Sequence, residues 1–374
     1  MKKHFGAAWV LILFTALPLI LFALLPRRDW SAAEKRYLAE FPALTAENLR
    51  GGRETELLEA YAADHFPGRN FFVGVYACWN LLLGKNGTES VIVGDDGVLV
   101  QASATRDLTQ TAANLERFDR FAGASGLPAS IVLVPDAGYM LEDLLPANHL
   151  PYPDEEAFRL AEGCSHLRFI DLREPFRTER ERGHQLYYRT DHHLTSYGCF
   201  AAANAFRAAS GLPALDEAAF TVERYSGFHG TVWSSGGYWL MGADDVELWI
   251  PSYPVRVTIS EAGEEEVSSD SPFFRDNLER EDMYTVFLDG NHTLVRLENP
   301  DAGADAGTLL MIRDSYANCA ASFFAESFRR VVLVDLRYYR GSVSALMTEE
   351  GVTEIVFLYG VGNLSTDTNS AWLY

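Results

Sequence analysis

The sequence contains few cysteines, with only four among its 374 residues: Cys78, Cys164, Cys199 and Cys319. Four dispersed cysteines are too few for the disulfide framework of a small secreted domain, and their spacing does not fit a zinc ribbon. We expect buried free thiols, with a Cys164–Cys199 pair left open for an oxidising compartment. The sequence also lacks a fixed-period repeat and a low-complexity tract, which excludes a repeat array.

Positive charge is scarce as well. The chain has 31 Lys and Arg against 52 Asp and Glu, so its formal net charge is -21. Such a surface would repel phosphates, which excludes nucleic acid as a partner and disfavours docking on anionic lipid headgroups. The contents of 48% hydrophobic and 22% charged residues are those of a folded globular protein, and the length suits one large domain or two ordinary ones.

The N-terminal segment is the longest apolar stretch of the sequence. The run from Ala7 to Leu25 carries no charge. About 20 such residues span a bilayer core of about 30 Å as a helix. Lys2 and Lys3 precede the run, and the LLPRRDW segment after it offers no small-x-small cleavage site. We therefore predict that residues 1–28 form an uncleaved transmembrane signal anchor.

The rest of the chain divides by its patterns. Residues 29–90 are expected to form a helical lead-in, and residues 91–374 an α/β domain with a β-rich insertion at about 212–306. Continuous apolar strands such as ASIVLV, TLLMIR, VVLVDL and EIVFLYG alternate with helical segments. This alternation predicts a mainly parallel sheet covered on both faces. Ligands of such sheets bind beyond the carboxyl ends of the strands.

Two short segments contain residues suited to catalysis. Asp191, His192 and His193 lie in YYRTDHHLTSYG, just before a predicted helix, and Asp314 and Ser315 lie in LLMIRDSYAN, between a strand and a helix. A serine hydroxyl needs an imidazole to take its proton, and the imidazole needs a carboxylate to fix its tautomer. Backbone N–H groups at a helix start can stabilise an oxyanion.

Other interpretations of these residues remain open. Asp314 or Ser315 can cap the following helix, and Asp191 can cap its own helix with the two histidines as ordinary polar residues. A metal site is a third reading, but the HExxH spacing that would support it is absent. Its possible ligands would be Asp191, His192, His193, His184 and His229. The FLYGVGN segment lacks the third glycine of a dinucleotide loop, so no cofactor and no metal are assigned.

The DHHLTSYG segment is similar to the signature of the DHHW family, with Leu194 in place of the tryptophan. Other segments follow the pattern of that family in the same order, from about residue 30 to the end: EKRYLAEFP, DHFPGRN, VIVGDDGVLV, IVLVPDAGYM, GFHGTVWSSGG, YTVFLDGNH, IRDSYANCAASFFAESF, VVLVDLRYY and FLYGVGN. The sequence thus resembles the DHHW family, which is similar to the alginate O-acetylation proteins of the SGNH hydrolase superfamily. This resemblance implies an SGNH hydrolase-like, three-layer α/β/α fold.

Carried over by position, the resemblance implies a catalytic triad. Asp191 would be the orienting carboxylate, His193 the general base and Ser315 the nucleophile. Four further residues would line the substrate pocket or the oxyanion site: His192, Asn291, Arg313 and Tyr316. The sequence departs from the family pattern at Leu194, which removes an aromatic surface beside the base. It departs again at Asp314, whose charge would lie near the oxyanion.

The function implied by the resemblance is acyl transfer. We expect a bacterial, single-pass membrane protein with an extracytoplasmic C-terminal domain, acting as an acyl (acetyl) transferase or esterase on a cell-surface polysaccharide. Its partners would be the glycan and an acyl donor, such as a membrane acyl-transfer protein. The orientation rests on the resemblance, because Lys2 and Lys3 are balanced by Arg27 and Arg28 across the anchor. The alternative is a non-catalytic glycan-binding or assembly factor that retains the fold.

Overall fold

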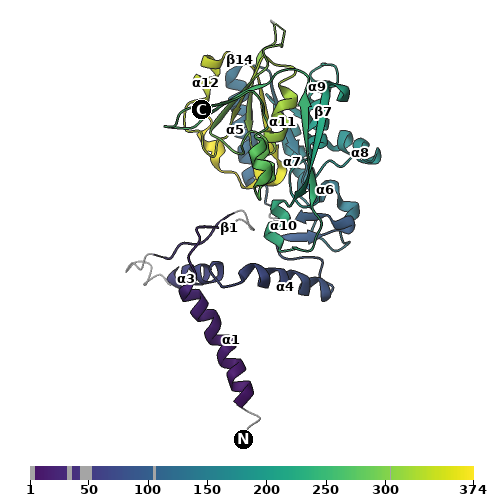
Figure 1. Cartoon of the computed structure of the whole chain (residues 1–374). Coiled ribbons are helices and arrows are strands. Elements are labelled where there is room, and N and C mark those ends of the chain that lie inside the picture. Colours follow the sequence, from purple (N-terminus) through teal and green to yellow (C-terminus); the bar gives the residue numbers. More distant parts are fainter. Residues whose placement is uncertain (1–4, 32–35, 43–52, 104–106, 304) are drawn as a thin grey trace. The chain divides into compact units, whose positions relative to one another are not determined.

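The computed structural model describes five ranges of the chain: residues 5–31, 36–42, 53–103, 107–303 and 305–374 (Figure 1). Lys2, Lys3 and parts of the predicted lead-in lie outside these ranges. The chain divides into two compact units. The smaller unit comprises Met1–Thr88 and Trp233–Leu240, and the larger comprises Glu89–Val232 and Met241–Tyr374.

The smaller unit is mostly helical. Its elements are α1 (Phe5–Leu24), β1 (Trp30–Ser31), β2 (Arg36–Tyr37), α3 (Arg53–Asp64) and α4 (Arg69–Leu82). The turn between α3 and α4 contains Gly68 with φ of 74°, a backbone conformation that favours glycine. Within the ranges given above, no helix reaches the combination of length and apolar character needed to cross a bilayer.

The larger unit is built on an eight-stranded mixed sheet in the order β10-β9-β11-β13-β12-β14-β5-β6. The strands are β5 (Ala129–Val134), β6 (Arg168–Ile170), β9 (Arg256–Ser260), β10 (Val267–Ser269), β11 (Leu294–Glu298), β12 (Thr308–Arg313), β13 (Arg330–Val334) and β14 (Val352–Gly360). The five strands from β13 to β6 pair in parallel, whereas β10, β9 and β11 pair antiparallel. The prediction of a mainly parallel sheet therefore holds for one part of it only.

The antiparallel part comes from the predicted β-rich insertion. Its strands β9, β10 and β11 extend the edge of the sheet instead of forming a separate body. Antiparallel neighbours can be joined by short connections, whereas parallel neighbours need a crossover such as α11 (Ala317–Phe324) between β12 and β13. The insertion also contributes a ribbon of β7 (Phe220–Phe228) and β8 (Asp244–Pro251), with α10 (Thr231–Gly236) between them.

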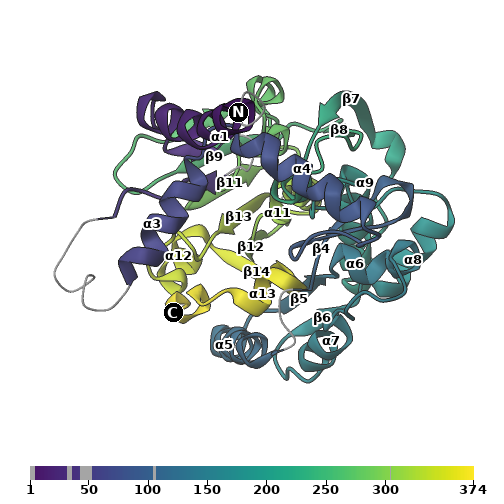
Figure 2. The same cartoon turned by 90° about the horizontal axis from the view of Figure 1, so that it is seen from below.

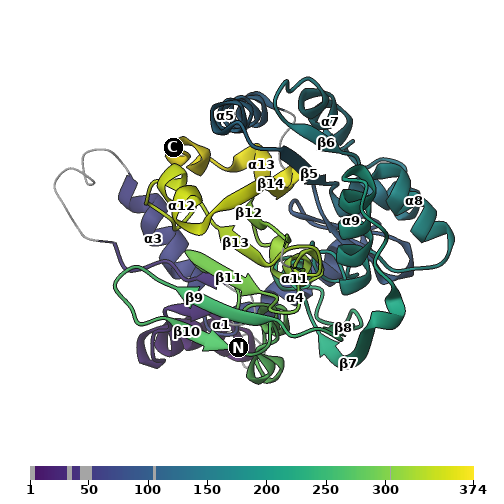
Figure 3. The ribbon, with the colours of Figure 1, turned by 90° about the horizontal axis from the view of Figure 1, so that it is seen from above.

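Helices cover both faces of the sheet (Figures 2 and 3). Side chains of each central strand alternate between two cores, so Met311 of β12 lies in one and Leu310 and Ile312 in the other. The first core includes residues of α8 (Arg173–Glu181), α9 (Ser196–Ala209) and α11 (Ala317–Phe324). The second includes residues of α5 (Thr109–Ser125), α7 (Asp154–Glu162), α12 (Val343–Glu350) and α13 (Val361–Thr366). The result is a three-layer α/β arrangement.

The remaining elements lie around the carboxyl edge of β5. The hairpin of β3 (Val91–Val93) and β4 (Leu99–Gln101) has its turn at Asp95–Gly97, and Asp96 has a φ of 56° there. The short helix α6 (Ala137–Met140) follows β5 directly.

The four cysteines are free thiols. Cys199 on α9 and Cys319 on α11 are buried and hydrogen-bond each other, and burial raises the pKa of the Cys199 thiol. Cys164 is half-buried, and its thiol donates to the backbone oxygen of Leu160 at 3.8 Å. The neighbour of Cys199 is therefore Cys319, and the Cys164–Cys199 pair is not formed.

Candidate active site

The candidate nucleophile follows the central strand β12. Its apolar residues TLLMIR pair in parallel with β13 on one side and β14 on the other, and the strand ends at Arg313. Asp314 and Ser315 come next, and α11 begins at Ala317. Ser315 therefore lies at the carboxyl edge of the sheet, where ligands of open α/β sheets bind.

The candidate base is held by a tight loop before α9. Leu194 pairs with Tyr187 in an isolated antiparallel bridge, and the backbone oxygen of His193 accepts from the amide of Tyr188 at 3.3 Å. Thr195 caps α9, because its hydroxyl accepts from the amide of Gly198 at 3.1 Å. Leu194 is 1% exposed, so the residue at the tryptophan position of the family signature belongs to the core and offers no stacking surface.

Asp191, His193 and Ser315 lie together in the order expected for a catalytic triad. His193 Nδ1 lies 2.6 Å from Asp191 Oδ1, and His193 Nε2 lies 2.8 Å from Ser315 Oγ. The carboxylate assigns the ring proton to Nδ1, which leaves Nε2 to accept the serine proton. All three residues are buried. Two segments 122 residues apart thus supply one hydrogen-bonded chain.

The carboxylate of Asp191 is saturated with donors. Besides the ring of His193, Oδ1 accepts from the His193 amide at 2.9 Å. The other oxygen, Oδ2, accepts from the amide of Thr231 at 2.6 Å and from its hydroxyl at 2.9 Å. Since the Thr231 hydroxyl donates to Asp191, it accepts from Nδ1 of His192, which lies 2.9 Å away. This arrangement fixes the plane of the carboxylate.

A second carboxylate, that of Asp244, binds the two residues before Asp191. Asp244 accepts from the amide of Arg189 at 3.0 Å and from the amide and hydroxyl of Thr190 at 2.8 and 2.7 Å. The Thr190 hydroxyl in turn accepts from the amide of Gly230 at 3.0 Å. The segment 190–191 is therefore fastened to the segment 230–231 at two successive positions.

Two tyrosines flank the imidazole. The ring of Tyr284 stacks on that of His193 with centroids 3.9 Å apart and an interplanar angle of 12°, and its hydroxyl donates to the backbone oxygen of Ser315 at 3.3 Å. Tyr316 meets the imidazole edge-on at 5.2 Å, and its hydroxyl donates to the backbone oxygen of His192 at 2.8 Å. Burial raises the pKa of both phenols well above their ordinary value, so both remain neutral donors.

Asp314 turns away from the neighbouring serine. Its carboxylate accepts from the amide of Tyr316 at 3.0 Å, the amide of Gly360 at 2.8 Å and the side-chain amide of Asn363 at 2.8 Å. Burial raises the pKa of Asp314, and these three hydrogen bonds oppose that rise. From the sequence, the negative charge of Asp314 would lie near the oxyanion. In the structure, the carboxylate is directed instead toward the amides of Tyr316, Gly360 and Asn363.

The start of α11 offers fewer free amides than the sequence suggests. The amide of Tyr316 donates to Asp314, that of Ala317 donates to the backbone oxygen of Asp314, and that of Asn318 donates to the backbone oxygen of Ser315. These three N–H groups are engaged within the turn. The expectation that they stabilise an oxyanion directly is therefore not met by this geometry.

Arg313 and Asn291 form a polar cluster of their own. Arg313 is 1% exposed, and burial lowers the pKa of its guanidinium. One of its nitrogens donates to Asn291 Oδ1 at 2.8 Å and lies 3.5 Å from Asp335. Asn318 donates to the same Asn291 oxygen at 3.1 Å. This oxygen of Asn291 therefore accepts hydrogen bonds from both Arg313 and Asn318. Arg313 lies beneath the surface instead of lining an open pocket.

One group of possible metal ligands overlaps the candidate triad. Among the described residues, Asp191, His192 and His193 have ligand atoms within 4.8 Å of one another, and this group includes neither His184 nor His229. His193 already directs one nitrogen to Asp191 and the other to Ser315. His184 stacks on Tyr197, with centroids 3.9 Å apart. The donor set suits proton transfer better than metal coordination.

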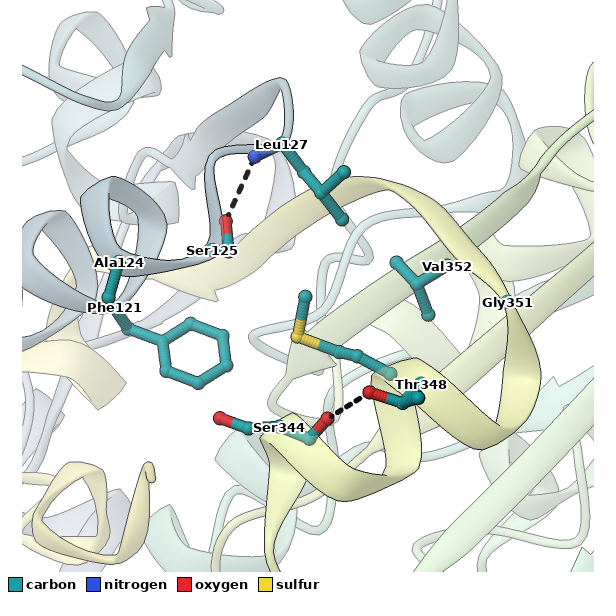
Figure 4. Close-up of a pocket in the computed structure, with 9 residues that line it drawn as sticks. Phe121, Ala124, Ser125, Leu127, Ser344, Thr348, Gly351 and Val352 are labelled. Atoms are coloured by element: carbon teal, nitrogen blue, oxygen red, sulfur yellow. Dashed lines mark hydrogen bonds between the residues drawn. The ribbon is translucent and has the colours of Figure 1, made fainter.

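A surface pocket of about 410 Å³ lies at the opposite edge of the sheet (Figure 4). It is formed between the C-terminal part of α5 and α12, and its lining includes Phe121, Leu127 and Met347. Val352, also in the lining, is the first residue of β14 and pairs with the first residue of β12. Ser315 follows the other end of β12, so this pocket lies away from the triad.

Comparisons with known proteins agree with this architecture. A family model for DHHW proteins matches residues 171–334, a range that contains all three residues of the triad. The resemblance to the DHHW family is confirmed. A second family model, described as an SGNH hydrolase-like domain of the acetyltransferase AlgX, matches residues 94–227. No curated protein matches the sequence.

Two solved structures share the fold. A DHHW family protein from Eubacterium siraeum is 20% identical, with a TM-score of 0.63, over 76% of this chain and 95% of that chain. Bacillus cereus PatB1, solved with a sulfonyl adduct, is 17% identical, with a TM-score of 0.65, over 76% of this chain and 98% of that chain. At these identities the likeness shows the fold alone.

Three residues of this site were not identified from the sequence. Thr231, Asp244 and Tyr284 lie 40, 53 and 93 positions beyond Asp191 (231 minus 191, 244 minus 191, 284 minus 191). None belongs to a motif with chemistry of its own. The Gly-Thr pair in GFHGTVW is the one available signal, since a glycine before a hydroxyl residue is typical of a turn that approaches another backbone closely.

Proposed function

We propose that this protein is a serine-dependent acyltransferase of the SGNH type, which transfers acetyl groups to a cell-surface polysaccharide. The observation that carries the proposal is the position of His193 between Asp191 at 2.6 Å and Ser315 at 2.8 Å. An imidazole held by a carboxylate and in contact with a serine hydroxyl is the arrangement that activates the hydroxyl for attack on an ester.

The reaction proceeds in two balanced steps. Ser315 Oγ attacks the carbonyl carbon of an acetyl donor while His193 Nε2 takes the hydroxyl proton, and the proton then passes to the departing alcohol. A hydroxyl of the glycan next attacks the acetyl-serine, gives its proton to His193 and leaves as the acetyl ester, while Ser315 recovers its proton. Asp191 stabilises the imidazolium that forms in both steps. Water in place of the glycan gives the esterase reaction.

The matched families support acetyl as the transferred group. The model matching residues 94–227 is named for the acetyltransferase AlgX, and its range includes both Asp191 and His193. The resemblance to alginate O-acetylation proteins supports a polysaccharide as the acceptor. A net charge of -21 favours an acceptor that is neutral or carries positive groups.

We place the catalytic domain outside the cytoplasm, on a chain that a single N-terminal helix anchors in the cell membrane. The charge-free run from Ala7 to Leu25 supports the anchor, and the DHHW resemblance supports the orientation. Protease added to intact cells should then release a fragment containing the residues after α1. Protection of that fragment in intact cells, with cleavage after lysis, would contradict this orientation.

The test of the function uses 4-nitrophenyl acetate and an aromatic sulfonyl fluoride on the full chain. We expect ester turnover in the wild type, loss of turnover in Ser315→Ala and His193→Ala, and a sulfonyl adduct on the peptide that contains Ser315. Ser344→Ala, which changes an exposed serine on α12, is the matched control and should behave as the wild type. Unchanged turnover in a folded Ser315→Ala protein would refute the proposal.

A further inference from the structure

Helix α4 belongs to the smaller unit and packs one of its faces on the segment 233–240 of that unit. Gly74 and Ala77 of this face are closely covered. A side chain at Gly74 would meet the ring of Trp239, whose Nε1 would lie at 2.6 Å from the added carbon. The same Nε1 donates to the backbone oxygen of Asn70 at 2.8 Å. One side of α4 is therefore fixed against the segment 233–240.

The opposite face of α4 and its C-terminal end is apolar and exposed. Its residues recur at positions 72, 75, 76, 79, 82 and 83, which is the spacing of a single helix face. Their exposed fractions range from 48% to 80%. With Phe71, the set comprises Phe71, Phe72, Val75, Tyr76, Trp79, Leu82 and Leu83, and we call it the α4 stripe. Contiguous apolar surfaces of this kind mark interaction sites.

The charges around the α4 stripe differ from those of the rest of the chain. From residue 67 to residue 88 there is no acidic residue, although the whole chain has a net charge of -21. Arg69 at the start of α4 and Lys85 just after it are the charged residues of this stretch. Arg69 lies 3.7 Å from Asp64 and its side chain is 25% exposed, so Lys85 is the exposed basic residue beside the stripe. Trp and Tyr rings next to a basic residue are typical of a helix that lies at a membrane surface.

The same unit contains the most apolar helix of the chain. Phe22 near the end of α1 contacts Tyr61 of α3 edge-on, with ring centroids 6.1 Å apart. Arg27 lies over the ring of Phe22 at 4.1 Å. Helix α3 leads into α4 through the short turn at Gly68. Helices α1 and α4, which both expose apolar side chains, thus belong to the same unit.

We propose that the α4 stripe lies in the interfacial region of a lipid bilayer, with its aromatic rings among the headgroups and upper acyl chains. This surface goes beyond the proposed function and does not depend on the triad. The bilayer is the occupant that the aromatic content of the stripe, the exposed Lys85 and the lack of acidic residues from 67 to 88 favour together. A second copy of the chain or another protein would also cover an apolar face, and the experiment separates these cases.

The test places a fluorescent bimane on the α4 stripe of the full chain. Cys78 and Cys164 are first replaced by alanine, and single reporters are introduced as Leu82→Cys and Trp79→Cys. Leu82 is 80% exposed, so its replacement removes little packing. Tyr338→Cys in the larger unit, whose side chain is 49% exposed, is the matched control. Each protein is reconstituted into vesicles of phosphatidylcholine and phosphatidylglycerol.

The expected result is a loss of fluorescence at positions 82 and 79 when the vesicles contain lipids with a nitroxide at headgroup depth. Aqueous iodide should quench the control at 338 and not these two reporters. Quenching of 82 and 79 by iodide to the same extent as 338 would overturn the proposal. Protection of both from iodide and from nitroxide lipid would overturn it too, since a protein would then cover the face. Circular dichroism of each variant checks that the helices are retained.

Discussion

Thr231 binds Asp191 through two groups at once. Its amide and its hydroxyl both donate to Oδ2, at 2.6 and 2.9 Å, while the other carboxylate oxygen receives the ring of His193. A carboxylate held on both oxygens cannot rotate about its bond to Cβ. The orientation of the candidate base is therefore set by a residue of a different segment, the first residue of α10.

The Thr231 hydroxyl should contribute to turnover through this orientation. Thr231→Val retains the shape and the amide but removes the hydroxyl, and a lost hydrogen bond to a charged group is worth about 1.5–3 kcal/mol. We expect kcat for 4-nitrophenyl acetate to fall roughly 10–100-fold, with KM little changed. Thr231→Ser keeps the hydroxyl and should restore most of the rate. Equal losses in both variants would point to a packing role instead.

Gly230 should tolerate no side chain. An added Cβ would overlap Cβ of Asp191 and lie 2.5 Å from the backbone oxygen of Thr190, so one of the two segments must move. We expect Gly230→Ala to lose most of its ester turnover, because Asp191 is displaced from His193. Gly242→Ala is the control, since nothing lies within 4 Å of an added Cβ there. Comparable turnover in the two variants would show that the loop accommodates the methyl group.

Asp191 should be needed as a carboxylate. In Asp191→Asn the amide group can occupy the same space, but it no longer favours the tautomer that leaves Nε2 free to accept a proton. A change of this kind lowers kcat by about 10⁴-fold in a serine protease triad. We expect a loss of at least about 10²-fold here, measured as the initial rate with 4-nitrophenyl acetate. Asp245→Asn, at a partly exposed site in β8, should leave the rate unchanged.

A pair of carboxyl groups near β5 should make stability depend on pH. Asp154 is fully buried, and one of its oxygens accepts from the amide of Asp136 at 2.8 Å. Burial raises the pKa of Asp136 to about 6, and burial together with the charge of Asp136 raises the pKa of Asp154 well above its ordinary value. The native state therefore keeps protons that the unfolded chain releases, so the free energy of unfolding falls as pH rises from about 4 to about 6.

Asp154→Asn removes one member of this pair. Above about pH 6 the variant should be more stable than the wild type by about 1–2 kcal/mol, since Asp136 then ionises without a like charge beside it. Below about pH 3 both carboxyl groups are protonated in either state, and the advantage should disappear. Urea unfolding at several pH values measures the difference. An advantage of the same size throughout this range would contradict the electrostatic cause.

The candidate site could be predicted from the sequence wherever the chemical type of a residue and its position in the chain both indicated a role. Asp191 and His193 lie two residues apart before a helix, and Ser315 follows an apolar strand, so the type and place of each residue already indicate a role. The direction of the Asp314 side chain was not accessible in this way. It depends on Gly360 at the end of β14 and on Asn363 in α13, which no local pattern around the serine reveals.

The fold was predictable to a similar degree. Strands such as TLLMIR and EIVFLYG have continuous apolar runs in their interior because both of their faces are covered, and this pattern predicts the parallel part of the sheet. The strands RVTIS and LVRLE alternate apolar with polar residues, which suits a strand in any partly exposed sheet. Their antiparallel pairing at the edge of the main sheet depends on the register between β9, β11 and β13, which is set by tertiary contacts.

The central place of β12 in the sheet has a consequence for thermal inactivation. Ser315 is attached to a strand with parallel neighbours on both sides, whereas Asp191 and His193 lie on a loop secured by a few polar contacts. Such loops open at a lower free energy than central strands. Gentle warming should thus separate the imidazole from the hydroxyl while the sheet stays intact, and the proposed ester turnover should return on cooling.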